Sequence, residues 1–192
     1  GVPMPRPATL AVIDWKAVFE SGLEYSAWLA VAESPELRDK MEVLRQALVL
    51  EAPVVGFLGA LPRPVHVVAI AEDWCGDVVR HVPVLQRLAE AAPSLSVRYL
   101  SREQHPDVFV RFLTNGGEAI PKFIFLSDRF VECGSWGPMP EACRELISRG
   151  KACGDVGAAR KKVAALYEAD SNRREVVREL TRLMDIAASR EP

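Results

Sequence analysis

At residues 72–78 the chain reads Glu-Asp-Trp-Cys-Gly-Asp-Val. Residues 65–71, just before it, form a short and almost unbroken apolar run, which is typical of a central strand buried on both faces. Residues 75–92, which follow, carry apolar side chains at helical spacing. Cys75 is therefore expected at the start of a helix, where unpaired N–H groups and the helix dipole stabilise negative charge. A thiolate at such a position is a candidate nucleophile.

A second cysteine is missing from this site. Dithiol sites carry it three residues after the first, and Val78 occupies that position. The other cysteines are Cys133, Cys143 and Cys153, and none is expected within the ~7 Å between Cα atoms that a disulfide needs. Turnover at Cys75 would then require a thiol from outside the chain.

The hydrophobic pattern predicts an α/β domain with extra helices at both ends. Strand, helix and strand in succession imply a parallel crossover, and a later hairpin makes the sheet mixed. Ser34 is expected to cap one helix, and Asn172 the last one. In chain order we expect helices at 14–32 and from 34, a strand at 65–71, a helix at 75–92, a strand at 95–100, a short helix from 106, strands at 123–126 and 130–133, and helices at 141–149, from 155 and from 172.

This order, with the cysteine motif at the first junction of strand and helix, resembles the thioredoxin fold. Thioredoxins carry a proline eight residues after the first cysteine, and Pro83 stands eight residues after Cys75. They carry a cis proline before the fourth strand, and Ile120-Pro121 stands there. Sixteen residues after that proline they have a glycine beside the thiol, which here is Gly137.

The resemblance covers residues 62–150, which are expected to form a thioredoxin-like core. Residues 1–61 would be an N-terminal tail and helical extension, and 151–192 would be C-terminal helices packed on the core. The extension and the motif Glu-Asp-Trp-Cys-Gly-Asp resemble a poorly characterised bacterial branch of the thioredoxin-like superfamily.

Three positions depart from the thioredoxin pattern. Val78 replaces the resolving cysteine, Ala69 replaces a buried acid that accepts a proton, and Asp77 replaces a proline. A lone cysteine is also found in monothiol glutaredoxins, but the Gly-Gly-Asp segment by which that family grips glutathione is missing after Pro121. The resemblance therefore supports the prediction of the fold more strongly than it supports a prediction of the activity.

Cys75 is the predicted catalytic residue, and seven neighbours are predicted to shape a docking surface around it. A bound peptide would pair with the backbone at Ile120 as an added strand. For the two tryptophans in this set, packing inside the protein is an equally open interpretation. The surface consists of Trp74, Gly76, Asp77, Ile120, Pro121, Trp136 and Gly137.

The composition narrows the function classes. A net charge of −2 gives no reason to expect a nucleic-acid partner, and no apolar run is long enough to span a membrane. No group of cysteines and histidines has metal-ligand spacing, so neither a metal nor another cofactor is expected. The absence of a basic stretch followed by an apolar segment near residue 1 favours a cytoplasmic protein, and the oligomeric state is not indicated.

Two functions stay open at this point. In the first, Cys75 forms mixed disulfides with a protein or low-molecular-weight thiol or disulfide partner, as a monothiol thiol-disulfide oxidoreductase in thiol redox homeostasis. In the second, the protein is a redox-inactive thioredoxin-fold binding module.

Overall fold

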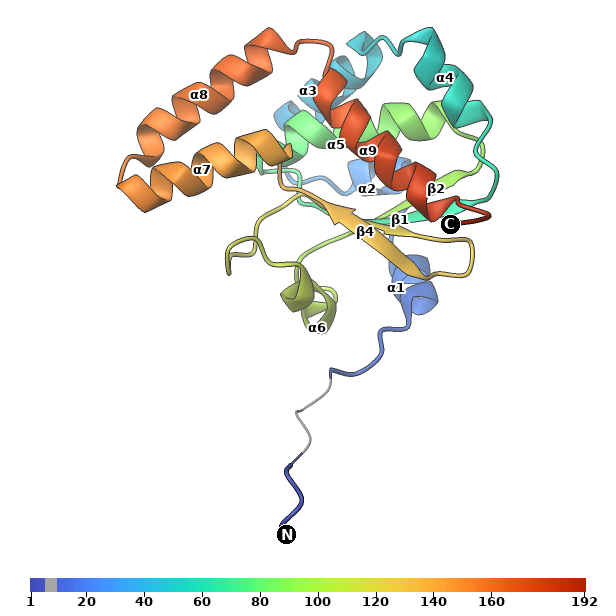
Figure 1. Ribbon diagram of the computed structural model, residues 1–192. Helices are drawn as coiled ribbons and strands as arrows, with labels where there is room; N and C mark the ends of the chain where they lie inside the picture. The colour runs from blue at the N-terminus through green and yellow to red at the C-terminus, as the bar shows by residue number, and fades with distance from the viewer. Residues whose placement is uncertain (6–9) are drawn as a thin grey trace.

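The computed structural model describes residues 1–5 and 10–192 (Figure 1). Residues 6–9, part of the expected N-terminal tail, lie outside the described residues. At the centre is a four-stranded sheet in the order β2-β1-β3-β4. The strands are β1 (Val65–Ile70), β2 (Leu95–Leu100), β3 (Lys122–Leu126) and β4 (Glu132–Trp136). β1 and β2 are parallel, and β3 is antiparallel to β1 and to β4, which confirms the predicted mixed sheet.

The strand register determines where the site forms. β1 continues through the loop 71–75 into α5 (Gly76–Ala91), which leads back to β2. Ile70 pairs with Leu100 of β2 and with Lys122 of β3. The C-terminal ends of β1 and β2 therefore meet the start of β3 at one edge of the sheet. The loop that carries Cys75 and the segment Ile120-Pro121 lie side by side there.

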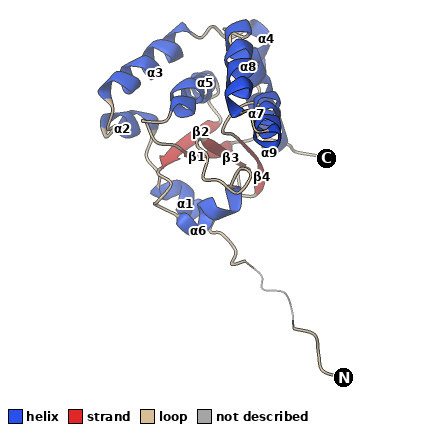
Figure 2. Ribbon diagram, turned by 90° about the vertical axis from the view of Figure 1, so that its left-hand side faces the viewer, coloured by secondary structure: helices blue, strands red, loops and turns tan. Residues whose placement is uncertain are grey.

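Helices cover both faces of the sheet (Figures 1 and 2). On one face, α5 and α9 (Arg174–Ala187) pack on the strands, and α3 (Pro35–Ala47) and α4 (Ala52–Gly59) pack on α5. The other face carries α1 (Trp15–Ser21) and α6 (Pro106–Phe109), with a 3-10 turn at Val110–Phe112. α2 (Tyr25–Ala30) lies beside β2, and α7 (Glu141–Cys153) and α8 (Val156–Ala169) form a helical hairpin.

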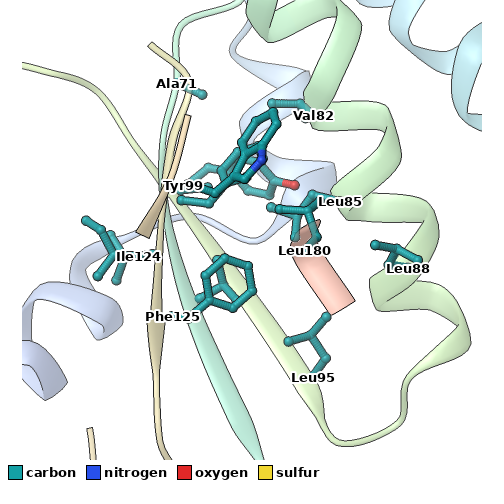
Figure 3. Packing of buried hydrophobic residues seen from close by; sticks show 14 of the residues in the cluster. Ala71, Val82, Leu85, Leu88, Leu95, Tyr99, Ile124, Phe125 and Leu180 are labelled. Carbon is teal, nitrogen blue, oxygen red and sulfur yellow. The ribbon is translucent and has the colours of Figure 1, made fainter. Parts of the chain in front are cut away.

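The main core lies between α5 and the sheet. Figure 3 shows Val82, Leu85 and Leu88 of α5 turned towards Tyr99 and Phe125, and all five side chains are buried. This confirms the apolar face that the sequence predicted for the helix. Each aliphatic side chain fully buried in this way contributes about 1.5–3 kcal/mol. The packing holds α5 at a fixed position over the strands, and with it the residue that begins the helix.

The long helix expected at 14–32 is wrong, because the chain breaks between α1 and α2. Leu23 leaves the helix and pairs with Tyr99 of β2, with its N–H 2.9 Å from the Tyr99 carbonyl oxygen and its carbonyl oxygen 2.8 Å from the Tyr99 N–H. The pairing gives hydrogen-bond partners to part of the otherwise unpaired edge of β2. A Cβ atom at Gly22 would lie 2.8 Å from the Cβ atom of Arg98, so the close approach requires a glycine.

The last strand and the helix caps also differ from the prediction. The return strand begins at Glu132 rather than 130, because Phe130 adopts a left-handed backbone (φ 61°) and stacks on His66 at 4.3 Å. Neither Ser34 nor Asn172 caps a helix with its side chain. Asp170 caps α9 in place of Asn172, accepting hydrogen bonds from the first N–H groups of that helix. α4 is a helix that the sequence analysis did not identify.

Candidate functional site

Cys75 is the N-cap residue of α5, with an extended backbone that turns helical at Gly76. Its thiol is half-buried and donates to the Ile120 carbonyl oxygen, with Sγ and O 3.5 Å apart. The sulfur therefore lies at the positive end of a sixteen-residue helix, partly open to solvent. This is a position from which a thiolate can attack a disulfide sulfur.

All four cysteines are free thiols. Val78, at the position of the second cysteine of a dithiol site, is completely buried in the core. Burial raises the pKa of the thiols of Cys133 and Cys143, which disfavours their reactive thiolate forms. Cys153 is exposed near the end of α7.

Two loops with cis prolines meet beside the thiol. The Ile120–Pro121 and Gly137–Pro138 peptide bonds are both cis. A Cβ atom at Gly137 would lie 2.0 Å from the Pro121 carbonyl oxygen, and its φ of 125° disfavours any other residue. The predicted glycine is therefore the residue that lets the second loop approach the first.

Lys122, which follows Pro121, connects these two loops by a hydrogen bond. Its ammonium donates to the Gly137 carbonyl oxygen at 2.8 Å and to the Thr114 hydroxyl at 2.9 Å. The side chain is buried, which together with the charge of Arg144 lowers the pKa of Lys122 to about 8. Sequence analysis did not single out this lysine, although a lysine at the start of an otherwise apolar strand was a signal for it.

Trp74 is the exposed aromatic residue of the site, with 48% of its surface accessible. Its indole N–H donates to the Glu72 carboxylate at 2.8 Å. The Arg102 guanidinium lies over the ring, 5.2 Å from its centroid, and is itself 4.0 Å from Glu72. The indole is thus held in one orientation on the surface, next to Cys75, instead of packing into the core.

Trp136 requires a correction, because it is not on the docking surface. Only 4% of it is accessible. The ring stacks on Phe123 with centroids 5.3 Å apart, and His81 contacts it edge-on at 5.2 Å. Its indole N–H donates to Glu179 of α9 at 2.9 Å. Trp136 joins sheet, α5 and α9, and cannot contact a partner without unfolding this region.

Asp77 and His81 form a polar layer on the inner side of α5. The Asp77 carboxylate lies 4.0 Å from the His81 imidazole, and the same imidazole nitrogen is 3.2 Å from the Tyr167 hydroxyl. Burial raises the pKa of Asp77, against the opposing charge of Arg80. Burial, with the charges of Arg173 and Arg80, holds the pKa of His81 well below its usual range. His81 is therefore a neutral core residue.

A cleft of about 360 Å³ lies beside Trp74, between the N-terminal helices and the loop 71–74. Asp73 is buried and accepts the backbone N–H of Ser34, so this bond ties the extension to the cysteine loop. Four carboxylates and, among the described residues, no Lys, Arg or His line the cleft, while the Arg102 guanidinium lies nearby over the Trp74 ring. Its lining consists of Leu23, Trp28, Val31, Ala32, Glu33, Ala71, Glu72, Asp73, Trp74, Tyr99, Ser101, Glu103 and Gln104.

Comparison with known proteins identifies the family. A family model described as Thioredoxin matches residues 22–156, which is most of the chain. The chain belongs to this thioredoxin family. The match includes α2, α3 and α4, which lie before the segment that resembles thioredoxin in sequence. No curated protein matches the chain.

Two solved structures share the fold of this thioredoxin-like chain. A protein of unknown function from Pseudomonas aeruginosa is 17% identical, with a TM-score of 0.71 over 91% of this chain and 98% of that one. An HIV epitope-scaffold is 15% identical, with a TM-score of 0.67 over 90% of this chain and 98% of that one. With about nine-tenths of this chain covered, both matches extend beyond residues 62–150.

Two further observations concern the described residues, 1–5 and 10–192. None of the helices there combines the length and the apolar character that crossing a bilayer requires. Nor do three or more His, Cys, Asp or Glu side chains converge there in the way that metal ligands do.

Proposed function

We propose that this protein is a monothiol member of the thioredoxin-like superfamily, of the bacterial branch with an N-terminal helical extension, which acts on cytoplasmic thiols. The Cys75 thiolate attacks one sulfur of a partner disulfide, R–S–S–R. A Cys75–S–S–R bond forms, and the second sulfur leaves as RS⁻. An outside thiolate, R′S⁻, then attacks the sulfur that carries R, so that R′–S–S–R forms and Cys75 leaves as a thiolate that can take up a proton. The net reaction is thiol-disulfide exchange, which would serve thiol redox homeostasis. In this proposal it involves no nucleic acid, membrane or bound cofactor.

One observation carries this proposal. The Cys75 sulfur is partly accessible at the start of α5 and lies against the Ile120 carbonyl, while the position three residues later is a buried valine. Disulfide exchange needs an accessible, stabilised thiolate, and release without outside help needs a second cysteine. The partial accessibility of Cys75 at the start of α5 supports the first requirement, and the buried Val78 leaves the second unmet, which favours mixed-disulfide formation over dithiol reduction.

The cleft beside Trp74 indicates which partners fit. Glu72 lies 4.0 Å from Arg102, and Asp73 is buried on the Ser34 N–H, so Glu33 and Glu103 are the carboxylates that favour a partner with positive charge near its disulfide. Exposed apolar side chains, Leu23, Val31 and Trp74, add contact area at the same place. We therefore assign to the partner, whether a protein segment or a small molecule, Lys- or Arg-like charge beside the reacting sulfur.

The alternative is a redox-inactive binding module, and Trp74 is the observation that favours it. A tryptophan fixed on the surface beside a cleft is suited to peptide binding with or without a thiol. In that case partner binding would survive Cys75→Ser, whereas mixed-disulfide formation requires the sulfur.

Three symmetric disulfides test both parts of the proposal. Cystamine is cationic, dithiodiglycolate is anionic and hydroxyethyl disulfide is neutral. The rate of adduct formation at Cys75 is followed by mass spectrometry of peptides, with the same disulfides reacted with 2-mercaptoethanol as the reference. We expect adducts on Cys75, none at this position in Cys75→Ser, and a preference for cystamine over dithiodiglycolate on the order of tenfold at low salt.

The charge preference has a matched control. Glu33→Gln combined with Glu103→Gln removes two charges from the cleft and should reduce the preference. Glu168→Gln combined with Glu191→Gln removes two charges outside it and should not. If no disulfide modifies Cys75, monothiol exchange is wrong. If all three modify it at rates that follow the reference thiol, exchange stands and the charge assignment is wrong.

A further inference from the structure

A small cavity of about 90 Å³ lies where the N-terminal extension, α5 and the α8–α9 loop meet. In Figure 1 this loop lies at the top of the molecule, beside α3. Apolar side chains from α3, α5 and Leu48 form part of the lining. Arg80 of α5 and Arg173 of the α8–α9 loop add two guanidinium groups, and the same loop adds a hydroxyl and an amide. The lining residues are Leu44, Ala47, Leu48, Arg80, Pro83, Val84, Ser171, Asn172 and Arg173.

The two arginines of this cavity have no carboxylate in direct contact. In the described part of the chain, neither Arg80 nor Arg173 forms an ion pair with a carboxylate, and the Arg80 guanidinium instead lies over the Tyr167 ring at 4.5 Å. Burial lowers the pKa of Arg173, and the charge of Arg80 lowers it further, so the two cations are close enough to repel. Nearby arginines do have partners: Arg174 pairs with Glu51 at 2.9 Å, and Arg178 pairs with Glu175 at 2.5 Å.

The carboxylates around the cavity are already engaged. Asp170 accepts the backbone N–H groups of Arg174 and Glu175 at 2.9 and 3.0 Å. Asp77 faces His81 from 4.0 Å and forms no ion pair with Arg80. Among the described residues, the two positive charges beside the cavity therefore have only the more distant carboxylates of Asp77 and Asp170 near them, and neither forms an ion pair with them.

Arg173 shows this most clearly. Its Nη1 atom is buried and has no hydrogen-bond partner among the residues that the structure describes. Its backbone is left-handed (φ 56°, ψ 33°), which is uncommon for a residue other than glycine. Leaving a buried guanidinium donor unpaired is costly, because the donor has given up its bonds to water. A strained backbone that holds such a donor in place is a common feature of ligand sites.

We propose that this cavity binds a small oxyanion, a phosphate group held by the guanidiniums of Arg80 and Arg173. The planar fork of an arginine matches a tetrahedral oxyanion with two parallel hydrogen bonds. The Ser171 hydroxyl and the Asn172 amide are neutral donors at the same cavity. The phosphate group is either free phosphate or the end of a phosphate monoester. Since the site joins α3, α5 and the α8–α9 loop, its occupation stabilises the packing of both added helical regions on the core.

Thermal unfolding with inorganic phosphate tests the site, at constant ionic strength and with chloride as the reference anion. We expect the melting temperature to rise and then saturate, by about 3–6 °C at ten times the dissociation constant. Arg173→Gln and Arg80→Gln should each remove the saturable rise, and Arg160→Gln on the exposed face of α8 should keep it. Without phosphate, Arg173→Gln should melt no lower than the unaltered protein, because it relieves charge repulsion.

Phosphate also stabilises proteins by exclusion from their surface, and that effect neither saturates nor depends on these arginines. An absent rise, or a rise that persists in both glutamine variants, would overturn the site. If Arg173→Gln does not fold, the Arg80→Gln variant alone decides whether the site exists, because Arg80 is exposed and its substitution should not disturb folding. O-Phosphoserine, compared with serine, distinguishes the sources: a rise with it assigns the site to monoesters as well, and a rise with inorganic phosphate alone assigns it to free phosphate.

Discussion

Trp74 and Trp136 were both expected to flank the thiol, and the fold gives them opposite environments. Trp74 is half exposed and is held over the surface by Glu72 and Arg102. Trp136 is buried between Phe123 and the His81 edge. One region of the site is therefore open to a partner, while the other is part of the core that supports it.

The difference shows that closeness to a reactive residue does not define a binding surface. Trp136 stands directly before Gly137, which touches the Pro121 loop, yet its side chain points into the protein. It supports the site indirectly, because it joins β4 to α5 and α9. Substitutions on the two sides should therefore separate effects on folding from effects on reactivity.

The largest expected effect comes from Trp136→Ala. Removing this buried indole leaves a cavity against Phe123 and takes one of its hydrogen bonds from the Glu179 carboxylate, which keeps the one from the Glu141 N–H, so the free energy of unfolding should fall by about 3–5 kcal/mol. Urea unfolding followed by circular dichroism measures it. A loss below 1 kcal/mol would mean that Trp136 is not part of the core.

Gly137→Ala should have the next largest effect. The added Cβ atom meets the Pro121 carbonyl oxygen, and alanine is strained at this backbone angle, so we expect a loss of about 2–4 kcal/mol. Gly76→Ala is the matched control, since a Cβ atom there meets nothing within 4 Å. Equal stabilities of the two variants would show that the loops are not in close contact.

The pH dependence of stability reports on His81, which lies between the two regions. Burial lowers its pKa in the folded protein, so the unfolded chain binds more protons below the ordinary value of 6.5. The stability that neutral His81 contributes is therefore fully present above pH 6.5 and is lost as the pH falls. The free energy of unfolding then falls by at most about 1.4 kcal/mol per pH unit. The pKa of His66 is also lowered by burial, so His66 likewise makes the protein less stable as the pH falls. The pKa of Asp77 is raised, so at lower pH Asp77 has the opposite effect on stability.

His81→Phe should reduce this slope between pH 7.5 and 5. Phenylalanine keeps the edge contact with Trp136, while the hydrogen bond to Tyr167 is lost at every pH, so the slope rather than the absolute stability is compared. Urea unfolding at several pH values provides it. An unchanged slope would show that another group dominates the acid sensitivity.

The smallest effect on stability is expected for Trp74→Ala, at most about 0.5 kcal/mol, because the side chain is half exposed. The same change should slow adduct formation with cystamine by about twofold, because the partner loses apolar contact with the exposed indole, over which Arg102 already lies. Unfolding and adduct kinetics on one sample give both numbers. If stability falls strongly and the rate is unaffected, Trp74 is a packing residue like Trp136.

Much of the fold could be predicted because its signals are local. The apolar run 65–71, the helical spacing after Cys75 and the hairpin near Asp128 each lie within one stretch of sequence. They predicted the mixed sheet and the position of the cysteine at the start of α5. The family match over residues 22–156 agrees with that architecture.

The errors fall where a distant partner determines the local structure. The helix at 14–32 breaks because Leu23 pairs with Tyr99, 76 residues further on. Glu33 and Glu103 show no common pattern in the sequence, but they line one cleft because α2 and α3 fold over the cysteine loop. The hydrophobic periodicity of a single segment carries no information about such distant pairings.

From the sequence alone it follows that one cysteine begins a helix after a buried strand, and that no second cysteine stands three residues later. Both statements depend on backbone geometry and spacing, which act over a few residues. Which tryptophan meets solvent, which carboxylates surround the cleft and which arginines lack partners were decided only when the chain packed. Burial and charge compensation depend on every neighbour in space, and most of those neighbours are far away along the chain.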